Sequence, residues 1–115
     1  MTILSTHVLD ATTGTPAAGI EVMLSSGGTE LARSRTDDDG RITEFPCPPI
    51  GAGTYTLTFA TGDYFAHRRT ETFYPEVVIT FRIPEQRPDA APDENRKFHV
   101  PLLLSPYSYS TYRGS

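Results

Sequence analysis

The sequence has few of the features that cross-link a chain or anchor it in a membrane. Its only cysteine, Cys47, excludes an intrachain disulfide framework and permits a reducing compartment. Because Cys47 lies between Pro46 and Pro48, we interpret it as a passive loop residue. No apolar run approaches the roughly 20 residues of a membrane-spanning helix, and the first residues lack the charged and apolar regions of a secretory signal. These absences predict a cytoplasmic protein with no membrane partner.

The chain also lacks an excess of positive charge. Its formal net charge is -4. Phosphate binding needs a basic surface, so this balance argues against a nucleic-acid partner.

Several catalytic and metal-binding patterns are missing as well. The chain contains no G-x-S-x-G nucleophile motif and no glycine-rich loop with phosphate-binding spacing. His7 and His99 have no Cys, Glu or Asp at ligand spacing. The aspartates at 37–39, followed by Gly40, lack the downstream glutamate of a calcium loop, so we interpret them as a tight hairpin turn. We therefore expect no metal ion and no organic cofactor.

Alternation of hydrophobic and polar residues dominates the chain, with the period of two that indicates β-strands. Five segments show it clearly, and these residues are expected to form one face of each strand: Leu4, Thr6 and Val8; Ile20, Val22 and Leu24; Tyr55, Leu57 and Phe59; Val77, Ile79, Phe81 and Ile83; and Phe98, Val100, Leu102 and Leu104. Weaker strands are expected at 30–36, 41–45 and 107–113. About eight short strands at near-regular spacing predict an all-β antiparallel sandwich or barrel. The length fits a single domain, residues 1–115.

Three local features interrupt this pattern. A short helix is expected at 62–70, with Asp63 as its cap. The polar, proline-rich segment 84–96 is interpreted as an exposed hairpin loop. Pro101 cannot donate to a strand ladder, so it predicts an edge, a bulge or a break in pairing.

His7 and His99 each lie out of phase with the hydrophobic residues of their strands. Strict alternation therefore directs both imidazoles away from the core. If the two strands are neighbours, both rings lie on one surface. Two interpretations stay open: a pair of ordinary half-exposed histidines, which is the commoner case for any single histidine, or a functional pair. For His67, on the expected helix, the ordinary interpretation is the stronger one.

The chain ends in a chemically dense run, residues 98–115. Chain ends are usually frayed, but this one follows an apolar strand and contains hydroxyls, tyrosines, a histidine and an arginine. We therefore expect this C-terminal segment to be ordered and to take part in the function of the protein. Arg113 here, and Arg41 after the aspartate run, are either solvated charges or donors to a carbonyl or an anionic heterocycle. Ser115 adds a hydroxyl and the terminal carboxylate.

Three segments resemble the transthyretin-like family and, within it, the 5-hydroxyisourate hydrolase branch. They are STHVLD with TGTPA at 5–17, TDDDGR at 36–41, and FHVPLLLSPYSYST continuing into YRGS at 98–115. The run SPYSYST is similar in hormone carriers and hydrolases and does not separate them. The hydrolase branch, unlike the carriers, has the counterparts of these residues: His7, Arg41, His99 and the closing Tyr112, Arg113, Gly114 and Ser115.

The resemblance implies a sandwich of seven to eight strands with one short helix. It further implies a homotetramer in which two edge-paired dimers face each other across a channel, with the active sites at the dimer–dimer interface. An interface can supply the concave, water-limited site for which a small sandwich has little room.

The resemblance also implies an activity, the hydrolysis of the small oxidised purine 5-hydroxyisourate in urate degradation. We expect His7 and His99 to position and deprotonate the attacking water, and Arg41 to bind the substrate and stabilise oxyanion charge. Ser115 is expected as a hydrogen-bonding catalytic participant. The expected substrate-binding residues are His7, Arg41, Tyr112, Arg113 and Gly114.

Two other functions are compatible with the same fold, because fold alone does not decide function. A non-catalytic carrier of a small aromatic ligand would explain SPYSYST but has no need of two histidines and an arginine. A structural or adhesive sandwich would leave the dense C-terminus unexplained. The sequence therefore favours the hydrolase.

Overall fold

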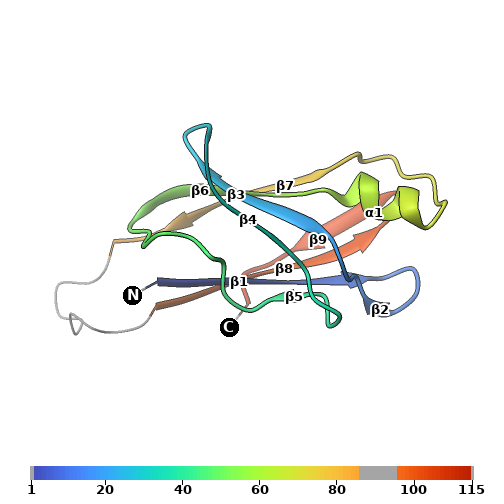
Figure 1. Cartoon of the computed structure of the whole chain (residues 1–115), viewed down its shortest axis with the longest axis horizontal. Helices are drawn as coiled ribbons and strands as arrows, with labels where there is room; N and C mark the ends of the chain where they lie inside the picture. Colours follow the sequence, from blue (N-terminus) through green and yellow to red (C-terminus); the bar gives the residue numbers. More distant parts are fainter. Residues whose placement is uncertain (1, 86–95, 115) are drawn as a thin grey trace.

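The computed structural model describes residues 2–85 and 96–114, which form two layered β-sheets with one short helix at one end (Figure 1). One sheet has the strand order β2-β1-β8-β9, with β5 also paired to β1, and the other has the order β4-β3-β6-β7. The elements are β1 (Thr2–Asp10), β2 (Thr15–Pro16), β3 (Glu21–Ser26), β4 (Thr29–Arg35), β5 (Arg41–Ile42), β6 (Gly53–Phe59), α1 (Thr61–His67), β7 (Val77–Ile83), β8 (Arg96–Ser105) and β9 (Ser108–Thr111). The predicted β-sandwich with one short helix is confirmed.

The core lies between the sheets and follows the predicted alternation. In β1 every second residue from Leu4 to Asp10 is buried, and the residues between them are only half-buried. Branched and aromatic side chains on one face of a pleated strand pack well against an opposing sheet. Phe81 differs from the expected core faces because it is only partly buried, packed against the edge of the core. The fully buried residues include Leu4, Val8, Val22, Leu24, Leu57, Phe59, Val77, Ile83, Leu102 and Leu104.

One strand pair departs from the expected antiparallel pattern. β1 and β8 run parallel, in register from Thr2 opposite Arg96 to Asp10 opposite Leu104. Only a short hairpin forces neighbouring strands to be antiparallel. Here the other sheet is formed by the chain between the two strands, so no such constraint acts on them.

Two local predictions are wrong. The helix begins at Thr61, Ala60 occupies the N-cap position without a side-chain cap, and Asp63 lies in the first turn. The helix starts this early because the preceding strand ends at Phe59 and a single residue, Ala60, separates the two; the Ala60 N–H donates to the carbonyl of Glu21 at 2.9 Å. The segment 84–96 does not join a hairpin, because β7 and β8 belong to different sheets; its residues 86–95 lie outside the described part of the chain.

Pro101 interrupts strand pairing on one side only. Toward β1 the ladder continues, with His7 opposite Pro101. Toward β9 it ends at Leu102 opposite Thr111, and one isolated bridge follows between His99 and Gly114. Successive residues of a strand direct their N–H and C=O groups to opposite neighbours, so the donor that proline lacks belongs to the β9 side. The predicted break in pairing is confirmed.

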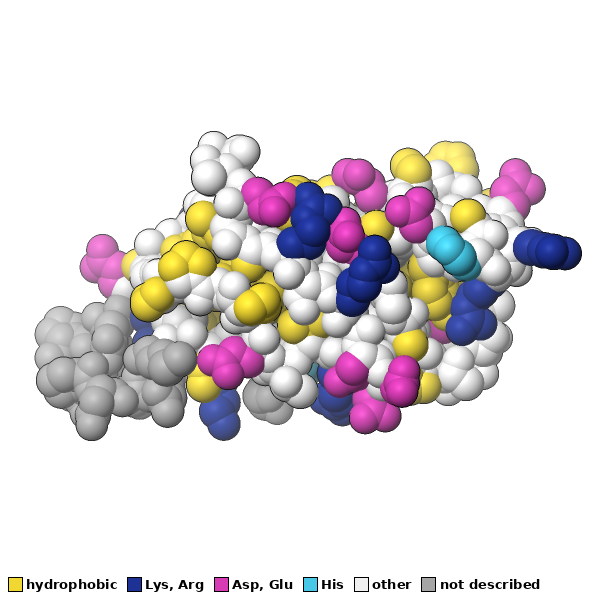
Figure 2. All heavy atoms as spheres, viewed as in Figure 1, with side chains coloured by type: hydrophobic (Ala, Val, Ile, Leu, Met, Phe, Trp, Pro, Cys, Tyr) yellow, Lys and Arg dark blue, Asp and Glu magenta, His cyan; other side chains and the backbone are white. Residues whose placement is uncertain are grey.

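Acidic and basic side chains are interspersed over the face made by β3 and β4 (Figure 2). Arg33 contacts both Glu21 and Glu30, and Arg35 lies 3.3 Å from Glu21. These exposed pairs contribute little to stability individually. No helix among the described residues is long and apolar enough to cross a membrane.

A buried hydrogen bond joins the end of β1 to the helix. The carboxylate of Asp10 accepts from the Tyr64 hydroxyl at 2.8 Å and from the N–H of Thr12 at 2.9 Å. Burial acts to raise the pKa of Asp10, but the hydrogen bonds from Tyr64 and Thr12 outweigh it and hold that pKa below its ordinary value. Burial and the neighbouring carboxylate raise the pKa of Tyr64 to about 12.

This bond predicts a pH-dependent effect of Tyr64→Phe. Loss of the hydroxyl leaves a buried carboxylate short of a donor, so we expect about 1.5–3 kcal/mol of destabilisation at pH 7. A depressed carboxyl pKa contributes stability above the unfolded-state value of about 3.9, and this contribution disappears as pH falls through the folded-state pKa. Urea unfolding of both proteins should therefore show a difference at pH 7 that shrinks toward pH 3. An equal difference at both pH values would contradict the role given to Asp10.

Candidate active site

His7 and Arg41 lie opposite each other on neighbouring strands. β1 and β5 are antiparallel, with His7 paired to Arg41 and Thr6 paired to Ile42. As predicted from alternation, His7 is half-buried and out of the core, while Arg41 is exposed. The pairing places an imidazole and a guanidinium next to each other on the edge of one sheet.

The aspartate turn before Arg41 determines this position. The side chain of Asp37 accepts from the N–H groups of Asp39 and Arg41, both at 2.9 Å. Gly40 has φ of 73°, its carbonyl accepts from Val8 N–H at 2.8 Å, and an added Cβ would lie 2.5 Å from the Val8 carbonyl oxygen. Only glycine satisfies both the backbone angle and the close approach. The turn is tight, as predicted, but it crosses between sheets instead of forming a hairpin.

β8 brings His99 to the same surface. In the parallel ladder Ser5 lies opposite His99, two residues before His7 on β1. The Ser5 hydroxyl and Nδ1 of His99 are 2.8 Å apart. Residues two apart on a strand share a face, so Ser5 and His7 lie on one side of the sheet beside His99. The predicted common surface for the two histidines is therefore present.

A hollow of about 240 Å³ opens at this surface. It is lined by Ser5, Thr6, Arg41, Ile42, Thr43 and His99. The guanidinium forms no ion pair among the described residues. The guanidinium, hydroxyls and imidazole of this lining are polar groups of the kind that fix the orientation of a small polar ligand.

The C-terminal tail closes against His99. The N–H of Gly114 donates to the His99 carbonyl at 2.9 Å. A Cβ on Gly114 would lie 2.5 Å from Cδ2 of the imidazole, so a side chain at this position would displace the ring. Glycine is needed here for close approach. Ser115, predicted as a catalytic participant, lies outside the described residues.

Tyr112 and Arg113 lie apart from this hollow. Both line a second hollow of about 250 Å³ between β7, β8 and the tail, and His99 lines this hollow as well. The Arg113 guanidinium carbon lies 5.1 Å from the ring centroid of Phe98, a core residue. Arg113 and Arg41 therefore line different hollows, with His99 common to both, and the predicted substrate contacts of Tyr112 and Arg113 stay predictions.

The electrostatic surroundings of His99 favour its neutral form. Partial burial lowers the pKa of His99 below its ordinary value, and the positive charges of Arg41 and His7 lower it further. A neutral imidazole at pH 7 has one nitrogen free to accept a proton. His99 can therefore act as a base without first losing a proton.

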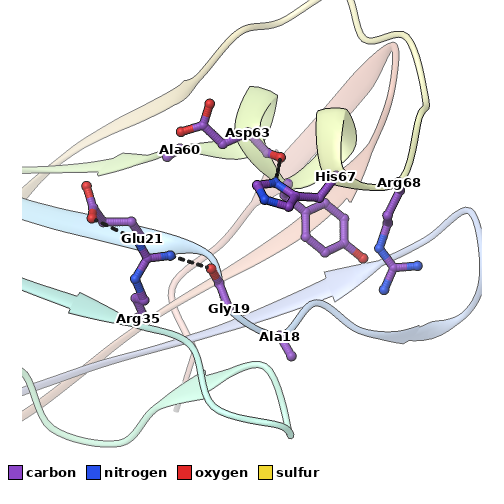
Figure 3. Close-up of a pocket in the computed structure, with 9 residues that line it drawn as sticks. Ala18, Gly19, Glu21, Arg35, Ala60, Asp63, His67 and Arg68 are labelled. Atoms are coloured by element: carbon purple, nitrogen blue, oxygen red, sulfur yellow. Dashed lines mark hydrogen bonds and ion pairs between the residues drawn. The ribbon is translucent and has the colours of Figure 1, made fainter.

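A larger hollow, of about 340 Å³, lies beside α1 and has a different character (Figure 3). Its polar groups bind each other: Arg35 contacts Glu21 and donates to the Gly19 carbonyl at 3.0 Å, and His67 Nδ1 donates to the Asp63 carbonyl at 2.8 Å. A ligand there would have to compete with these contacts. We therefore place the candidate site at His7, Arg41 and His99.

Two other sequence interpretations concern single residues and metals. Cys47 is half-buried against the core, and burial raises the pKa of its thiol, which disfavours the reactive thiolate. Within residues 2–85 and 96–114, no group of three or more His, Cys, Asp and Glu residues is arranged to hold a metal ion.

Sequence reasoning missed Ser5. The Ser5 hydroxyl contacts His99, one of the two predicted histidines. Ser5 itself belongs to the motif STHVLD, which also contains His7. The alternation that places His7 on the outer face also places Ser5 there, so the signal was present. Its partner became visible only with the parallel pairing of β1 and β8.

Known proteins match nearly the whole chain. A family model described as the HIUase/Transthyretin family matches residues 4–114. The 5-hydroxyisourate hydrolase of Salmonella dublin is 45% identical over 118 aligned residues, which cover 98% of this chain and 81% of that protein. The structure of the Klebsiella pneumoniae 5-hydroxyisourate hydrolase superposes with a TM-score of 0.87 at 43% identity, covering 100% of both chains. Transthyretin from Sparus aurata superposes with a TM-score of 0.80 at 28% identity, over 96% of this chain and 95% of that one.

The charge environment of the site predicts a measurable change in Arg41→Gln. Removing this positive charge should raise the pKa of His99 toward its ordinary value of about 6.5. A histidine-detected NMR titration of the labelled protein measures the shift. Arg35→Gln, which removes a guanidinium beside the other hollow, serves as the matched control and should leave His99 unchanged. A pKa that stays constant or falls in Arg41→Gln would contradict this electrostatic coupling.

Proposed function

The chain belongs to the HIUase/Transthyretin family, and from this premise we propose that it is a 5-hydroxyisourate hydrolase. The observation that carries the proposal is the meeting of His7, Arg41 and His99 on one sheet face beside a small polar hollow. These are the groups that separate the hydrolases from carriers of the same fold. The substrate is a small oxidised purine, and the reaction needs no redox step.

The chemistry is the hydrolysis of a cyclic amide. Water adds to a ring carbonyl of 5-hydroxyisourate, giving a tetrahedral intermediate with an oxyanion. The carbon–nitrogen bond then breaks, the ring nitrogen takes a proton, and the six-membered ring opens. The product is 2-oxo-4-hydroxy-4-carboxy-5-ureidoimidazoline. Two obstacles must be lowered: water is a weak nucleophile, and the intermediate concentrates negative charge on one oxygen.

His7 and His99 address the first obstacle. The lowered pKa of His99 keeps it neutral near pH 7, so that it can take a proton from water as the oxygen attacks. His7, on the adjacent strand, orients the same water by a hydrogen bond.

Arg41 addresses the second obstacle. Its exposed guanidinium stands at the wall of the hollow, where it can donate two parallel hydrogen bonds to carbonyl groups of the heterocycle. As the carbonyl oxygen becomes negative, these bonds strengthen. Stabilisation that grows toward the transition state raises the rate of the chemical step.

The tail completes the pocket in this proposal. Gly114 places the last main-chain segment against His99, and Ser115 follows it directly with a hydroxyl and the terminal carboxylate. We assign Ser115 a hydrogen bond to the substrate or to the attacking water. Tyr112 and Arg113 hold this segment beside β8.

We further propose that the active protein is a homotetramer. The candidate site lies on an outer sheet face and is open on one side, so a facing subunit would close it against water. β7 and β9 are edge strands in the described sheet orders and offer main-chain groups for pairing with a second copy. Both features support a channel between two edge-paired dimers.

The decisive experiment generates 5-hydroxyisourate in situ from urate with urate oxidase and follows its ultraviolet decay. Catalytic amounts of the protein should accelerate the decay well above the spontaneous rate. His7→Asn and His99→Asn should each lower turnover by about a hundredfold or more, as expected for loss of general base catalysis. His67→Asn, a substitution on α1 outside the site, is the matched control and should keep full activity.

Two outcomes would count against this assignment. Normal turnover in both active-site histidine variants would remove them from the mechanism. Decay at the spontaneous rate from folded wild-type protein would exclude the hydrolase, and stoichiometric binding of an aromatic ligand would then favour the carrier.

Removal of residues 112–115 tests the tail. The four residue pairs of the β8–β9 ladder end at Thr111, so the truncated chain should keep its fold. Its hydrolase activity should be lost because the pocket is incomplete. Circular dichroism reports the fold, and analytical ultracentrifugation of both proteins reports whether each is a tetramer. Retained activity would show the tail to be dispensable, and a wild-type monomer with full activity would overturn the interface site.

A further inference from the structure

Ser5 makes the one side-chain hydrogen bond to the imidazole of His99 found among the described residues. The two residues lie opposite each other on parallel strands, 94 positions apart in sequence, and the distance from Oγ to Nδ1 is 2.8 Å. Both are half-buried, and both line the 240 Å³ hollow. The contact is thus part of the candidate site and not a surface coincidence.

The proposed base role decides which ring nitrogen carries the hydrogen. A hydroxyl can donate or accept, so its bond to Nδ1 fits either neutral form of the imidazole. Because Nδ1 is engaged by the Ser5 hydroxyl, Nε2 is the nitrogen left to meet a water molecule. A base needs a lone pair there, so the hydrogen belongs on Nδ1, where the Ser5 hydroxyl accepts it. Nε2 is then the nitrogen with the free lone pair.

The opposite edge of the ring is fixed by the tail. Gly114 packs so closely that an added Cβ would lie 2.5 Å from Cδ2, the carbon bonded to Nε2. A half-turn of the ring would exchange Nδ1 with Cδ2 and lose the bond to the Ser5 hydroxyl. The hydroxyl on one edge and the glycine on the other therefore select a single ring orientation.

From this geometry we propose that Ser5 is a positioning residue, which holds His99 as the Nδ1–H form so that Nε2 accepts the proton of the attacking water. The inference rests on the proposed function and extends it. Ser5 acts through His99 and takes no part in the bond changes. In general, a partner that orients a functional imidazole fixes its tautomer and its direction.

The test combines a spectroscopic and a kinetic measurement on the full chain. Nitrogen-15 NMR of labelled histidines, recorded above the pKa of His99, distinguishes the two neutral forms. Wild type should show His99 with hydrogen on Nδ1, and Ser5→Ala should lose this preference. Ser5→Ala should also lower kcat about tenfold, as for other orienting partners of functional histidines, with KM changed less than about twofold because Ser5 does not hold the substrate.

Two further variants make the result specific. Ser5→Thr keeps a hydroxyl on a strand residue and should restore both the tautomer and kcat. Ser25→Ala removes a half-buried strand hydroxyl from the other sheet and should change neither. In the pH profile of Ser5→Ala, the neighbouring side chains Arg41 and His7 are unchanged, so any shift reports on the lost contact.

The outcomes separate this inference from the function on which it rests. If the wild type is active and Ser5→Ala keeps the wild-type tautomer of His99, the role given to Ser5 is overturned. This holds even if kcat falls, because a lower kcat without a tautomer change indicates only altered packing around the site. Wild-type kcat in Ser5→Ala overturns this role equally. Absence of wild-type turnover overturns the proposed hydrolase instead, and the NMR spectra still decide whether Ser5 determines the tautomer of the His99 imidazole.

Discussion

The parallel pairing of β1 with β8 joins segments from the two ends of the chain along nine residue pairs. Ser5 and His7 come from the first ten residues, and His99 comes from the last seventeen. Neither segment can form the site alone. Because the ladder fixes register as well as proximity, a slip by one residue would turn the histidines toward the core and the hydrophobic residues toward solvent. The buried faces of Leu4, Val8 and Leu102 therefore stabilise the active geometry together with the sandwich.

The remaining groups attach to this ladder. The aspartate turn binds Val8 through Gly40 and carries Arg41 to a position opposite His7. The tail turns back along β8 and reaches His99. Segments from the two ends of the chain and from its middle thus meet on one sheet. The candidate site lies on the outer surface, since the space between the sheets is filled by side chains.

Much of this arrangement follows from residues that can be read in the printed sequence. Alternation alone predicts the strands and the outward direction of His7 and His99, and the family resemblance predicts the function class. Parallel pairing cannot be read from alternation, because the period is the same in either direction, and this is why Ser5 was overlooked. The helix start was misjudged because Asp63 is a good capping residue, but only Ala60 separates the end of β6 from the start of α1. The side-chain direction of Arg113 depends on the tertiary contact with Phe98, which no local pattern contains.

Pro101 reduces the number of main-chain hydrogen bonds between the C-terminal tail and the rest of the sheet. Beyond Thr111 the chain is tied to β8 by the bridge at Gly114, and proline leaves the intervening position without a main-chain donor. Among the described residues, lifting 112–114 therefore breaks very few hydrogen bonds and leaves β9 in place. Local opening free energies are small where main-chain bonds are few. The segment beside His99 can therefore shift without unfolding any strand, while β1 and β8 keep their register.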